Sequence, residues 1–277
     1  MSQSPSTGPD QPVVRTEVTD RIGLITLNRP HRRNALNGEL IEALDEAVQA
    51  MAADPDAKIV VLTGAAPEGA HGGFCAGGDI KDGGIKRPEG DDRPMGAAPG
   101  TTADDLDRFD MHAPMLLHTM PKPTIAMVGG PAVGAGCSLA GACDLRYAAD
   151  DAVFSASFSA NGLSGDYGGS LFWTQIIGTA RTRQLYYLNE KLTAAEAHAW
   201  GMVNEVVPAA ELRAHVLEVA ARMVRIPGSL LGLIKENLTA AEQEADRRRR
   251  LFALEADNQR RAVADIAERM RRKSERS

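Results

Sequence analysis

Hydrophobic positions along the first 65 residues follow two periods, one typical of strands and one typical of helices. Residues 13–18 and 22–27 are rich in Val, Ile and Leu and flank a short polar turn, which predicts a β-hairpin. Apolar side chains then recur three to four residues apart over residues 39–51, and Asn37 stands in the N-cap position, which predicts an amphipathic helix. Residues 58–63 form a continuous apolar run, as expected of a strand buried on both faces of a parallel sheet.

Strands and helices continue to alternate through the rest of the chain. Thr193 and Glu196 match a capping box at the start of one helix. After residue 209 the pattern is helical, with Pro227-Gly228 as the one clear break. The alternation predicts an α/β fold with right-handed crossovers. The further predicted strands are residues 123–128, 143–147 and 203–207, and the predicted helices are residues 104–120, 171–177 and 193–200.

The pattern divides the chain into three parts. Residues 1–12 carry Ser, Pro, Gly and Gln and predict a disordered arm, residues 13–208 predict the folded core, and residues 209–277 predict a helical region. Residues 81–100 hold Gly, Pro, Asp and Arg with almost no apolar content, which favours a mobile loop within the core.

Composition and charge narrow the classes of function. The 277 residues are 43% hydrophobic and 25% charged, which is typical of an ordinary folded protein. A net charge of −6 argues against general nucleic-acid binding. The sequence contains no apolar run of about 18 residues, so we expect no membrane-spanning segment. The three cysteines lack paired spacing, which argues against a disulfide scaffold and favours a cytoplasmic location. The histidines do not form a pair with the spacing of a zinc motif, so we expect no metal site. From Glu244 onward the chain nevertheless carries a net charge of +4.

Three glycine-rich segments are candidates for chemistry. Residues 72–80 follow a predicted strand, and their glycines let backbone N–H groups approach a ligand, although a flexible turn has the same composition. Residues 129–140 place small residues at the start of a predicted helix, where free backbone N–H groups could bind an anion. Alternatively, these small residues allow two helices to pack closely. This segment matches a dinucleotide-binding motif only in part. Residues 162–170 place Asp166 among glycines, as a helix cap or a catalytic carboxylate.

Taken together, these segments resemble the enoyl-CoA hydratase/isomerase (crotonase) family from about residue 13 to the C-terminus. The resemblance implies a spiral of ββα repeats and a C-terminal helical region that mediates trimerisation, often with two trimers stacked as a hexamer. It also implies an acyl-CoA thioester substrate and no separate cofactor, because coenzyme A is part of the substrate. The segments that carry it are NRP at 28–30, RNAL at 33–36, VLTG at 61–64, FCAGGDI at 74–80, PTIAMVGG at 123–130, GAG at 134–136, AAEA at 194–197 and WGMVN at 200–204.

The resemblance assigns roles to particular residues. Two backbone N–H groups, of Gly78 and Ala135, match those that hold the thioester oxygen as an enolate develops. Preorganised donors of this kind are worth about 2.7–4 kcal/mol each. The positions that match the family's coenzyme A site are Arg33, Ala35, Ala76, Asp79 and Ile80.

This chain departs from the hydratases of the family at both catalytic glutamates. Ser138 and Phe158 stand there, and neither side chain activates a water molecule or delivers its proton. Asp166 instead matches the Asp of family members that shift double bonds, including those acting on ring-epoxidised phenylacetyl-CoA. The resemblance therefore favours an acyl-CoA double-bond isomerase with Asp166 as proton shuttle, and Phe158 would make the pocket drier and raise the pKa of that carboxyl.

Two alternatives to the isomerase stay open. One is a hydratase or another crotonase-type lyase or hydrolase, since one oxyanion site serves several chemistries. The other is a catalytically silent acyl-CoA-binding protein. The arginines at residues 247–250 form either a solvated helix face or part of a coenzyme A phosphate site completed by a neighbouring subunit. A homotrimer or homohexamer is expected.

Overall fold

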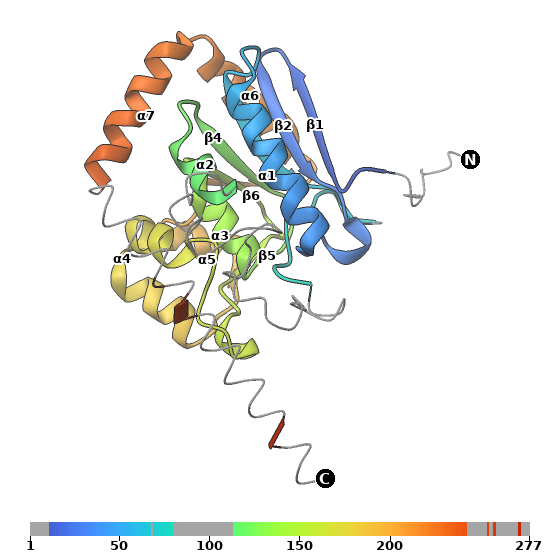
Figure 1. The fold of residues 1–277 in the computed structure, drawn as a ribbon, viewed down its shortest axis with the longest axis vertical. Helices are drawn as coiled ribbons and strands as arrows, with labels where there is room; N and C mark the ends of the chain where they lie inside the picture. The colour runs from blue at the N-terminus through green and yellow to red at the C-terminus, as the bar shows by residue number, and fades with distance from the viewer. Residues whose placement is uncertain are drawn as a thin grey trace.

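The computed structural model describes residues 11–67, 69–79 and 113–242, together with residues 254, 257–258 and 271–272. Strands and helices alternate along most of these residues (Figure 1). Several sequence predictions concern residues outside these ranges. They are most of the arm at residues 1–12, the loop at residues 81–100, the first part of the helix at residues 104–120 and the arginines at residues 247–250.

A six-stranded sheet forms the centre of the molecule, in the spatial order β1-β2-β3-β4-β6-β9. The predicted hairpin is confirmed, because β1 pairs antiparallel with β2 over the whole length of both strands. Every other neighbouring pair in this sheet is parallel, so each connection must cross over through other elements. The strands are β1 (Val14–Thr19), β2 (Ile22–Leu27), β3 (Ile59–Gly64), β4 (Thr124–Val128), β6 (Leu145–Ala149) and β9 (Glu205–Val207).

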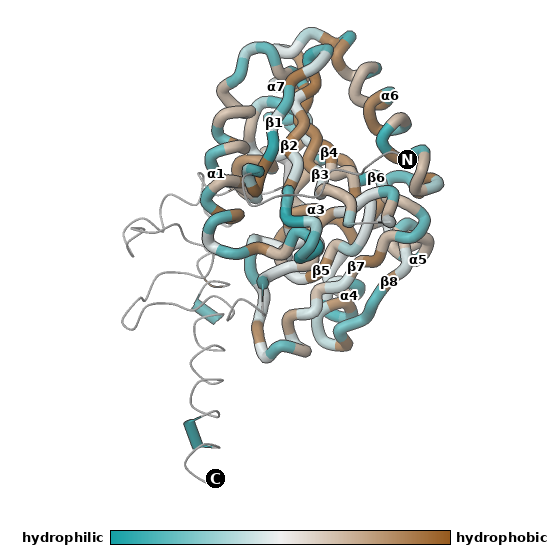
Figure 2. Tube along the Cα trace, turned by 90° about the vertical axis from the view of Figure 1, so that its right-hand side faces the viewer, coloured by the Kyte–Doolittle hydropathy of each residue, from teal (hydrophilic) through white to brown (hydrophobic). Residues whose placement is uncertain are grey.

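Helices cover both faces of this sheet. On one face lie α1 (Gly38–Ala53), α2 (Ala113–Thr119) and α3 (Ala135–Ala142), and on the other lies α6 (Leu212–Val224). Figure 2 shows the hydrophobic strands β3 and β4 between α1 and α6. All residues of β3 and β4 are buried, which explains why both strands appear in the sequence as continuous apolar runs.

The local signals for helix starts are confirmed in detail. The Asn37 side chain accepts a hydrogen bond of 3.0 Å from the N–H of Leu40 at the start of α1. Thr193 and Glu196 form the predicted reciprocal capping box at the start of α5 (Ala194–Trp200). Each cap satisfies N–H groups that have no partner within the helix, which is why short polar side chains at these positions predict the boundaries so well.

A second, smaller region lies beyond the carboxyl ends of the main strands. Its three-stranded sheet has β5 (Ala132–Val133) parallel to β7 (Val153–Ser155), which pairs antiparallel with β8 (Leu192–Thr193). Helix α4 (Gly169–Tyr187) packs against α3. The helix predicted at residues 171–177 is therefore longer than expected, because the chain resumes a helical path after the kink at Gly178, where φ is 77°.

Two further helices follow the last strand, as predicted. Helix α6 ends before Pro227, and α7 (Gly228–Glu242) then runs to one side of the sheet (Figure 1). Helix α7 exposes several large apolar side chains, namely Leu230, Leu233, Ile234 and Leu238. Within the part of the chain that the structure describes, no helix combines the length and the apolar character needed to cross a bilayer.

Candidate active site

The glycine-rich segments meet at the carboxyl edge of the parallel sheet. The segment after β3 pairs through Cys75 with Ala132 at the start of β5, and through Gly78 with Leu36 after β2. Three connections that are far apart in the sequence therefore lie side by side. Ligands of α/β folds usually bind in crevices at the carboxyl ends of parallel strands. This edge of the sheet is therefore the candidate active site.

Two glycines allow the first two segments to approach more closely than other residues would. A Cβ atom added to Gly77 would lie 2.7 Å from the carbonyl oxygen of Val133 and 3.5 Å from the Cα of Gly134. Gly77 and Gly134 also have positive φ values, 86° and 57°, which favour glycine. The backbone contact between Gly77 and Gly134 brings the next residue of each segment, Gly78 and Ala135, into proximity.

The N–H groups of Gly78 and Ala135 sit in suitable backbone settings for binding an oxygen atom. Ala135 is the first residue of α3, where a backbone N–H has no acceptor within the helix. Gly78 is exposed, and a Cβ atom added to it would have no heavy atom within 4 Å. The structure thus brings together the two residues that the sequence singles out as donors.

A buried ion-pair cluster holds the segment that carries Gly78. The carboxylate of Asp79 lies 3.0 Å from a guanidinium nitrogen of Arg29 and 3.1 Å from one of Arg32. The N–H of Asp79 donates a hydrogen bond of 2.9 Å to the carbonyl oxygen of Leu36. The N–H of Leu36 donates one of 2.8 Å to the carbonyl oxygen of Gly77. Asp79 is only 6% exposed, so its carboxylate anchors the loop from within.

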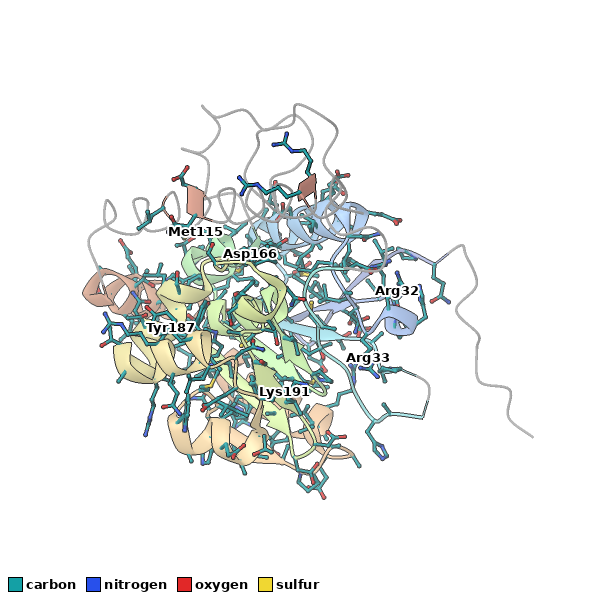
Figure 3. The ribbon with its side chains drawn as sticks, turned by 90° about the horizontal axis from the view of Figure 1, so that it is seen from below. Arg32, Arg33, Met115, Asp166, Tyr187 and Lys191 are labelled. Atoms are coloured by element: carbon teal, nitrogen blue, oxygen red, sulfur yellow. The ribbon has the colours of Figure 1, made fainter. Side chains whose placement is uncertain are left out.

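The other residues expected at a coenzyme A site lie around this cluster. Arg33 is exposed on the segment after β2 and lies beside Arg32 in Figure 3, while Ala76 is half-buried and its N–H donates to the carbonyl oxygen of Arg33 at 3.1 Å. Ala35 is buried, and its carbonyl oxygen accepts a bond from Arg29. Ile80 lies outside the described residues. Among the residues that the structure describes, Arg33 is thus an exposed cation next to the small residues Ala35 and Ala76.

Asp166 lies on a turn that the backbone holds in an unusual conformation. The φ values are 133° at Gly165, 55° at Tyr167 and 70° at Gly168, and the N–H of Gly169 donates to the carbonyl oxygen of Asp166 at 3.2 Å. Left-handed conformations at non-glycine residues carry strain and concentrate at functional sites. The turn places Asp166 in front of α4, near the centre of the view in Figure 3.

The alternative role of Asp166 as the cap of a helix is wrong. The N-cap residue of α4 is Gly168, and no side chain forms a capping hydrogen bond there. The helix begins two residues later than the sequence pattern suggested for an Asp cap, because Gly168 adopts the left-handed conformation that turns the chain into α4. The helix-cap role is thus excluded, which leaves a structural carboxylate and a catalytic carboxylate as the two interpretations of Asp166.

Charges near Asp166 show which groups share its environment. Burial raises the pKa of the Cys75 thiol to about 12, and the negative charge of Asp166 contributes to this rise. Burial also raises the pKa of Tyr167 well above its usual value, with smaller contributions from Asp45, Asp166 and Cys75. Both groups stay protonated near neutral pH, so neither a thiolate nor a phenolate supplies the base at this edge.

The two positions that carry glutamates in hydratases lie next to the second donor. Ser138 is buried in α3, and its hydroxyl lies 3.5 Å from the carbonyl oxygen of Gly134. Phe158 is buried, and its ring lies about 4.0 Å from where a Cβ of Gly134 would stand. Phe158 also stacks on Tyr186 of α4, with ring centroids 5.8 Å apart. The sequence did not single out Tyr186, because an aromatic residue near a helix end has no distinguishing signal.

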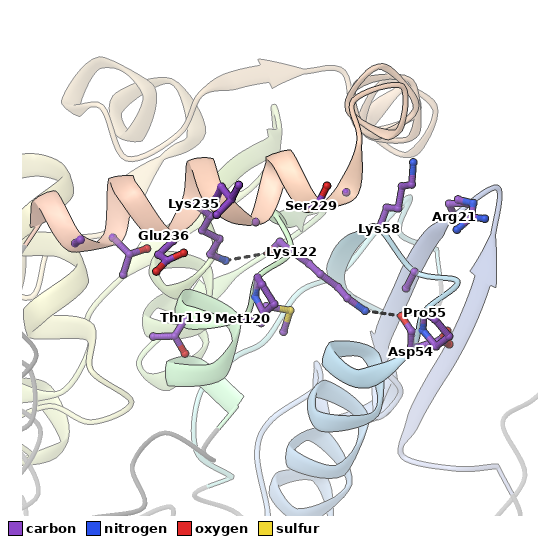
Figure 4. A pocket seen from close by; sticks show the side chains of 17 residues that line it. Arg21, Asp54, Pro55, Lys58, Thr119, Met120, Lys122, Ser229, Lys235 and Glu236 are labelled. Carbon is purple, nitrogen blue, oxygen red and sulfur yellow. Dashed lines mark hydrogen bonds between the residues drawn. The ribbon is translucent and has the colours of Figure 1, made fainter.

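A pocket of about 740 Å³ lies at the opposite, amino edge of the sheet (Figure 4). Its lysines are engaged by carbonyl oxygens. Lys58 donates to Val224 at 3.2 Å, and Lys122 donates to Met51 at 2.7 Å. Because these ammonium groups stabilise the ends of α6 and α1, the pocket lacks the open donors of the carboxyl edge. Within the described ranges, no three His, Cys, Asp or Glu side chains converge as a metal site requires.

Comparisons with known proteins agree with this arrangement. Residues 17–276 match the family model described as enoyl-CoA hydratase/isomerase. The chain is 34% identical over 229 residues to the 1,2-epoxyphenylacetyl-CoA isomerase of Escherichia coli K12, covering 83% of this chain and 82% of that protein. It is 32% identical over 233 residues to 4-chlorobenzoyl coenzyme A dehalogenase-1 of an Arthrobacter species, covering 83% and 79%. It is 33% identical over 228 residues to a probable enoyl-CoA hydratase of Mycobacterium bovis, covering 82% and 81%.

A solved structure shows the same fold. The enoyl-CoA hydratase from Mycobacterium avium subsp. paratuberculosis K-10 superposes with a TM-score of 0.75 at 30% identity, over 94% of this chain and 95% of that chain. The expected α/β architecture of the crotonase type is confirmed. The family model spans far more than half of the chain, and relatives above 30% identity cover more than two thirds of it. The chain belongs to the enoyl-CoA hydratase/isomerase, or crotonase, family of acyl-CoA enzymes.

Proposed function

We propose that this enzyme is an acyl-CoA double-bond isomerase that uses Asp166 as its single proton shuttle. The observation that carries the proposal is the setting of Asp166. It lies on a strained turn, and its charge acts on Cys75 in the segment that bears Gly78, while Ser138 and Phe158 replace the two glutamates of the hydratases. A single carboxylate in place of the two glutamates suits a reaction that only moves a proton.

The proposed reaction moves one proton between two carbons of a 3-enoyl-CoA. The Asp166 carboxylate takes a proton from C2, and the electrons of that C–H bond form a double bond between C1 and C2 as negative charge develops on the thioester oxygen. The N–H groups of Gly78 and Ala135 hold this oxygen, each contributing about 2.7–4 kcal/mol to the stability of the transition state. Asp166 then returns the proton to C4, which leaves a double bond between C2 and C3.

Coenzyme A would bind along the segments that surround Asp79. The exposed guanidinium of Arg33 is available to a phosphate, and Ala35 and Ala76 leave space for the pantetheine arm. Asp79 contributes indirectly, because its ion pairs with Arg29 and Arg32 hold the loop that presents the Gly78 N–H. In this proposal the chain needs no separate cofactor.

Hydration is the second candidate, and the names of several relatives favour it. The protein from Mycobacterium bovis is named a probable enoyl-CoA hydratase, whereas the one from Escherichia coli is named an isomerase. Hydration needs one group to activate water and another to deliver a proton. Since Ser138 and Phe158 supply neither, we expect slow hydration of crotonyl-CoA, well below the roughly 10 s⁻¹ of a typical enzyme. A rate at or above that value would support the hydratase.

Substitution of Asp166 tests the proposal directly. Asp166→Asn keeps the size of the side chain and removes its basicity, so turnover of 3-hexenoyl-CoA should fall by about 10²–10⁴-fold. Binding of hexanoyl-CoA and the melting temperature should change little, because other groups hold the thioester and the turn. Asp151→Asn, at an exposed position, is the matched control and should keep full activity.

Two results would contradict this mechanism. Full activity in Asp166→Asn would exclude the shuttle. Absence of any isomerase turnover in the wild type, together with tight acyl-CoA binding, would support the catalytically silent binding protein. Exchange of the C2 protons of bound hexanoyl-CoA with deuterium separates these cases, since a silent binder performs no proton transfer.

We further propose that the enzyme assembles as a homotrimer or homohexamer through its C-terminal helices. The support is the row of exposed leucine and isoleucine side chains on α7, which a monomer would leave in water. Closed assemblies bury such faces in symmetric interfaces. Sedimentation at micromolar concentration should give the mass of a trimer or hexamer, and a monomer would overturn the proposal.

A further inference from the structure

The side-chain amide of Asn34 joins three segments at the carboxyl edge of the sheet. Asn34 is fully buried, and its Oδ1 accepts a hydrogen bond of 2.9 Å from the N–H of Arg29, just after β2. Its Nδ2 donates to the carbonyl oxygen of Ala65, just after β3, at 3.0 Å and to that of Phe74 at 2.9 Å. Phe74 lies at the start of the segment that carries Gly78. One side chain thus connects the ends of two central strands to the segment of the first thioester donor.

The surrounding backbone is shaped to receive this amide. A Cβ atom added to Gly64 would lie 2.5 Å from the Nδ2 of Asn34, and one added to Gly73 would lie 3.2 Å from it. Arg33 and Asn34 both have left-handed backbone conformations, with φ values of 51° and 55°. Such conformations carry strain at residues other than glycine and persist only where the surroundings enforce them. The three hydrogen bonds of the Asn34 amide supply that constraint.

Backbone hydrogen bonds extend the alignment from Asn34 to the donor. The N–H of Ala76 donates to the carbonyl oxygen of Arg33 at 3.1 Å. Leu36 then pairs with Gly78 in a parallel bridge, so the hydrogen bonds of Leu36 go to the residues on either side of Gly78. In this pattern the N–H of Gly78 itself points away from Leu36. The direction of the donor therefore depends on how the segment after β2 lies along the donor segment, and Asn34 fixes that alignment.

We propose that Asn34 is a positioning residue that aims the N–H of Gly78 at the thioester oxygen. The inference rests on the proposed function, because it takes Gly78 as one of the two donors. Asn34 acts through Gly78, since its buried amide is bonded to backbone groups of the protein. A donor stabilises developing charge only if it is held in place before the reaction, and a displacement of about 1 Å is costly.

Two non-reacting ligands isolate the contribution of the thioester oxygen to binding. Hexanoyl-CoA has the carbonyl oxygen, whereas its thioether analogue S-hexyl-CoA has two hydrogen atoms in its place. Calorimetry on the full chain should show that the wild type binds hexanoyl-CoA about tenfold more tightly, as one well-placed hydrogen bond allows. Asn34→Gly removes the amide and tolerates the left-handed backbone, so this preference should fall to about twofold or less. A loss of stability alone would change both dissociation constants alike, so their ratio reports on the donor.

Asn204 provides a matched control at the amino edge of the sheet. Its Oδ1 accepts a hydrogen bond from the N–H of Arg146 at 2.8 Å, and its own N–H donates to the carbonyl oxygen of Arg146 at 2.8 Å. Asn34 and Arg29 form the same reciprocal pair, with distances of 2.9 and 2.8 Å. Asn204→Gly therefore removes a similar contact far from the donor, and it should keep the full preference for hexanoyl-CoA.

Arg32→Met tests the same alignment from the other side of the donor. The side chain of Arg32 is 26% exposed, and its guanidinium pairs with Asp79, the residue after Gly78. Loss of this pair loosens the donor segment, so the preference for hexanoyl-CoA should fall. Any contact of Arg32 with the phosphates cancels in the ratio, because both ligands carry the same coenzyme A. This variant decides the outcome if Asn34→Gly does not fold.

The outcomes separate this inference from the proposed function. A preference that survives in Asn34→Gly, or in Arg32→Met if Asn34→Gly does not fold, would overturn the positioning role and leave the isomerase untouched. An equal loss of preference in Asn204→Gly would overturn it as well. Full isomerase activity in Asp166→Asn together with a preference that depends on Asn34 would overturn the shuttle and keep the positioning role. Equal affinity of the wild type for the two ligands would overturn both the proposed donors and the role of Asn34.

Discussion

The two edges of the parallel sheet use opposite kinds of polar group. At the carboxyl edge, Gly77 and Gly134 pack backbone against backbone, so that N–H groups are presented to a ligand. At the amino edge, lysine ammonium groups fill a comparable space and are bonded to carbonyl oxygens. Lys235 is an example, since its Nζ lies 2.8 Å from the carbonyl oxygen of Leu117 and 2.8 Å from the carboxylate of Asp144.

This difference in polar groups indicates that the carboxyl edge of the sheet serves ligand binding and that the amino edge serves stability. Carbonyl groups at the C-terminal ends of helices attract cations, and lysines that reach them stabilise the packing of α1, α6 and α7. N–H groups can be kept for a ligand only if no protein acceptor reaches them and if no Cβ atom blocks the close approach of the two segments, as at Gly77 and Gly134. We therefore expect substitutions at the carboxyl edge to lower activity and those at the amino edge to lower stability.

Among the substitutions that compare the two edges, the largest effect is expected for Gly77→Ala at the carboxyl edge. The added Cβ would meet the carbonyl oxygen of Val133 and push apart the segments that carry Gly78 and Ala135. Loss of one such donor costs about 10²–10³-fold in turnover, which steady-state kinetics with 3-hexenoyl-CoA would measure.

Gly201→Ala provides the control for backbone strain. Gly201 has a φ of 84°, close to the 86° of Gly77, but a Cβ added there would have nothing within 4 Å. Both variants should lose a similar amount of stability from the left-handed conformation. Equal loss of activity in the two variants would show that strain alone, and not the approach of the two segments, explains the effect.

A large loss of stability is expected for Lys235→Met at the amino edge. Lys235 is 5% exposed, and its removal leaves Asp144 without its ammonium partner beside a buried carbonyl. Breaking a buried pair in this way should lower the free energy of unfolding by about 3 kcal/mol. Urea unfolding measures the change, and the folded fraction should retain normal turnover.

Lys191→Met is the matched control for this loss, because Lys191 is exposed (Figure 3). The Lys191→Met variant should have the same free energy of unfolding as the wild type. If Lys235→Met lowered turnover of the folded enzyme as strongly as it lowered stability, the proposed separation between the two edges would be wrong.

The smallest effect is a dependence on pH at Lys122. Burial lowers the pKa of Lys122 from its ordinary value of 10.5, against a smaller opposing influence of Asp54. Between the lowered pKa and 10.5, the unfolded chain binds more protons than the folded one, so the free energy of unfolding contributed by this group rises with pH. The difference in stability between wild type and Lys122→Met should therefore increase in favour of the wild type as the pH rises toward 10.5.

In this difference between two proteins, the contributions of other groups that titrate in the same pH range to the free energy of unfolding cancel. Tyr147 and Tyr167 have raised pKa values, which lowers stability as pH rises, but they are present in both proteins. Urea unfolding at several pH values would check the difference. A constant difference, or one that shrinks with increasing pH, would contradict the lowered pKa of Lys122.

Local elements could be predicted from the sequence where neighbouring residues carry the signal. Asn37 starts α1 as expected, Thr193 and Glu196 form their capping box, and the apolar runs of β3 and β4 lie at the centre of the sheet. The length of α4 was missed, because Gly178 interrupts the helical pattern that resumes after it. These outcomes follow from contacts within a few residues of one another.

The sequence by itself predicted most strands and helices of the main sheet, the family resemblance and the candidate site residues Gly78, Ala135 and Asp166. Only the tertiary structure decided that Gly77 and Gly134 touch and that Gly168, rather than Asp166, is the N-cap of α4. The physical reason is distance along the chain. Periodicity and caps depend on residues a few positions apart, whereas these approaches join segments whose separation in space depends on how the sheet and helices pack.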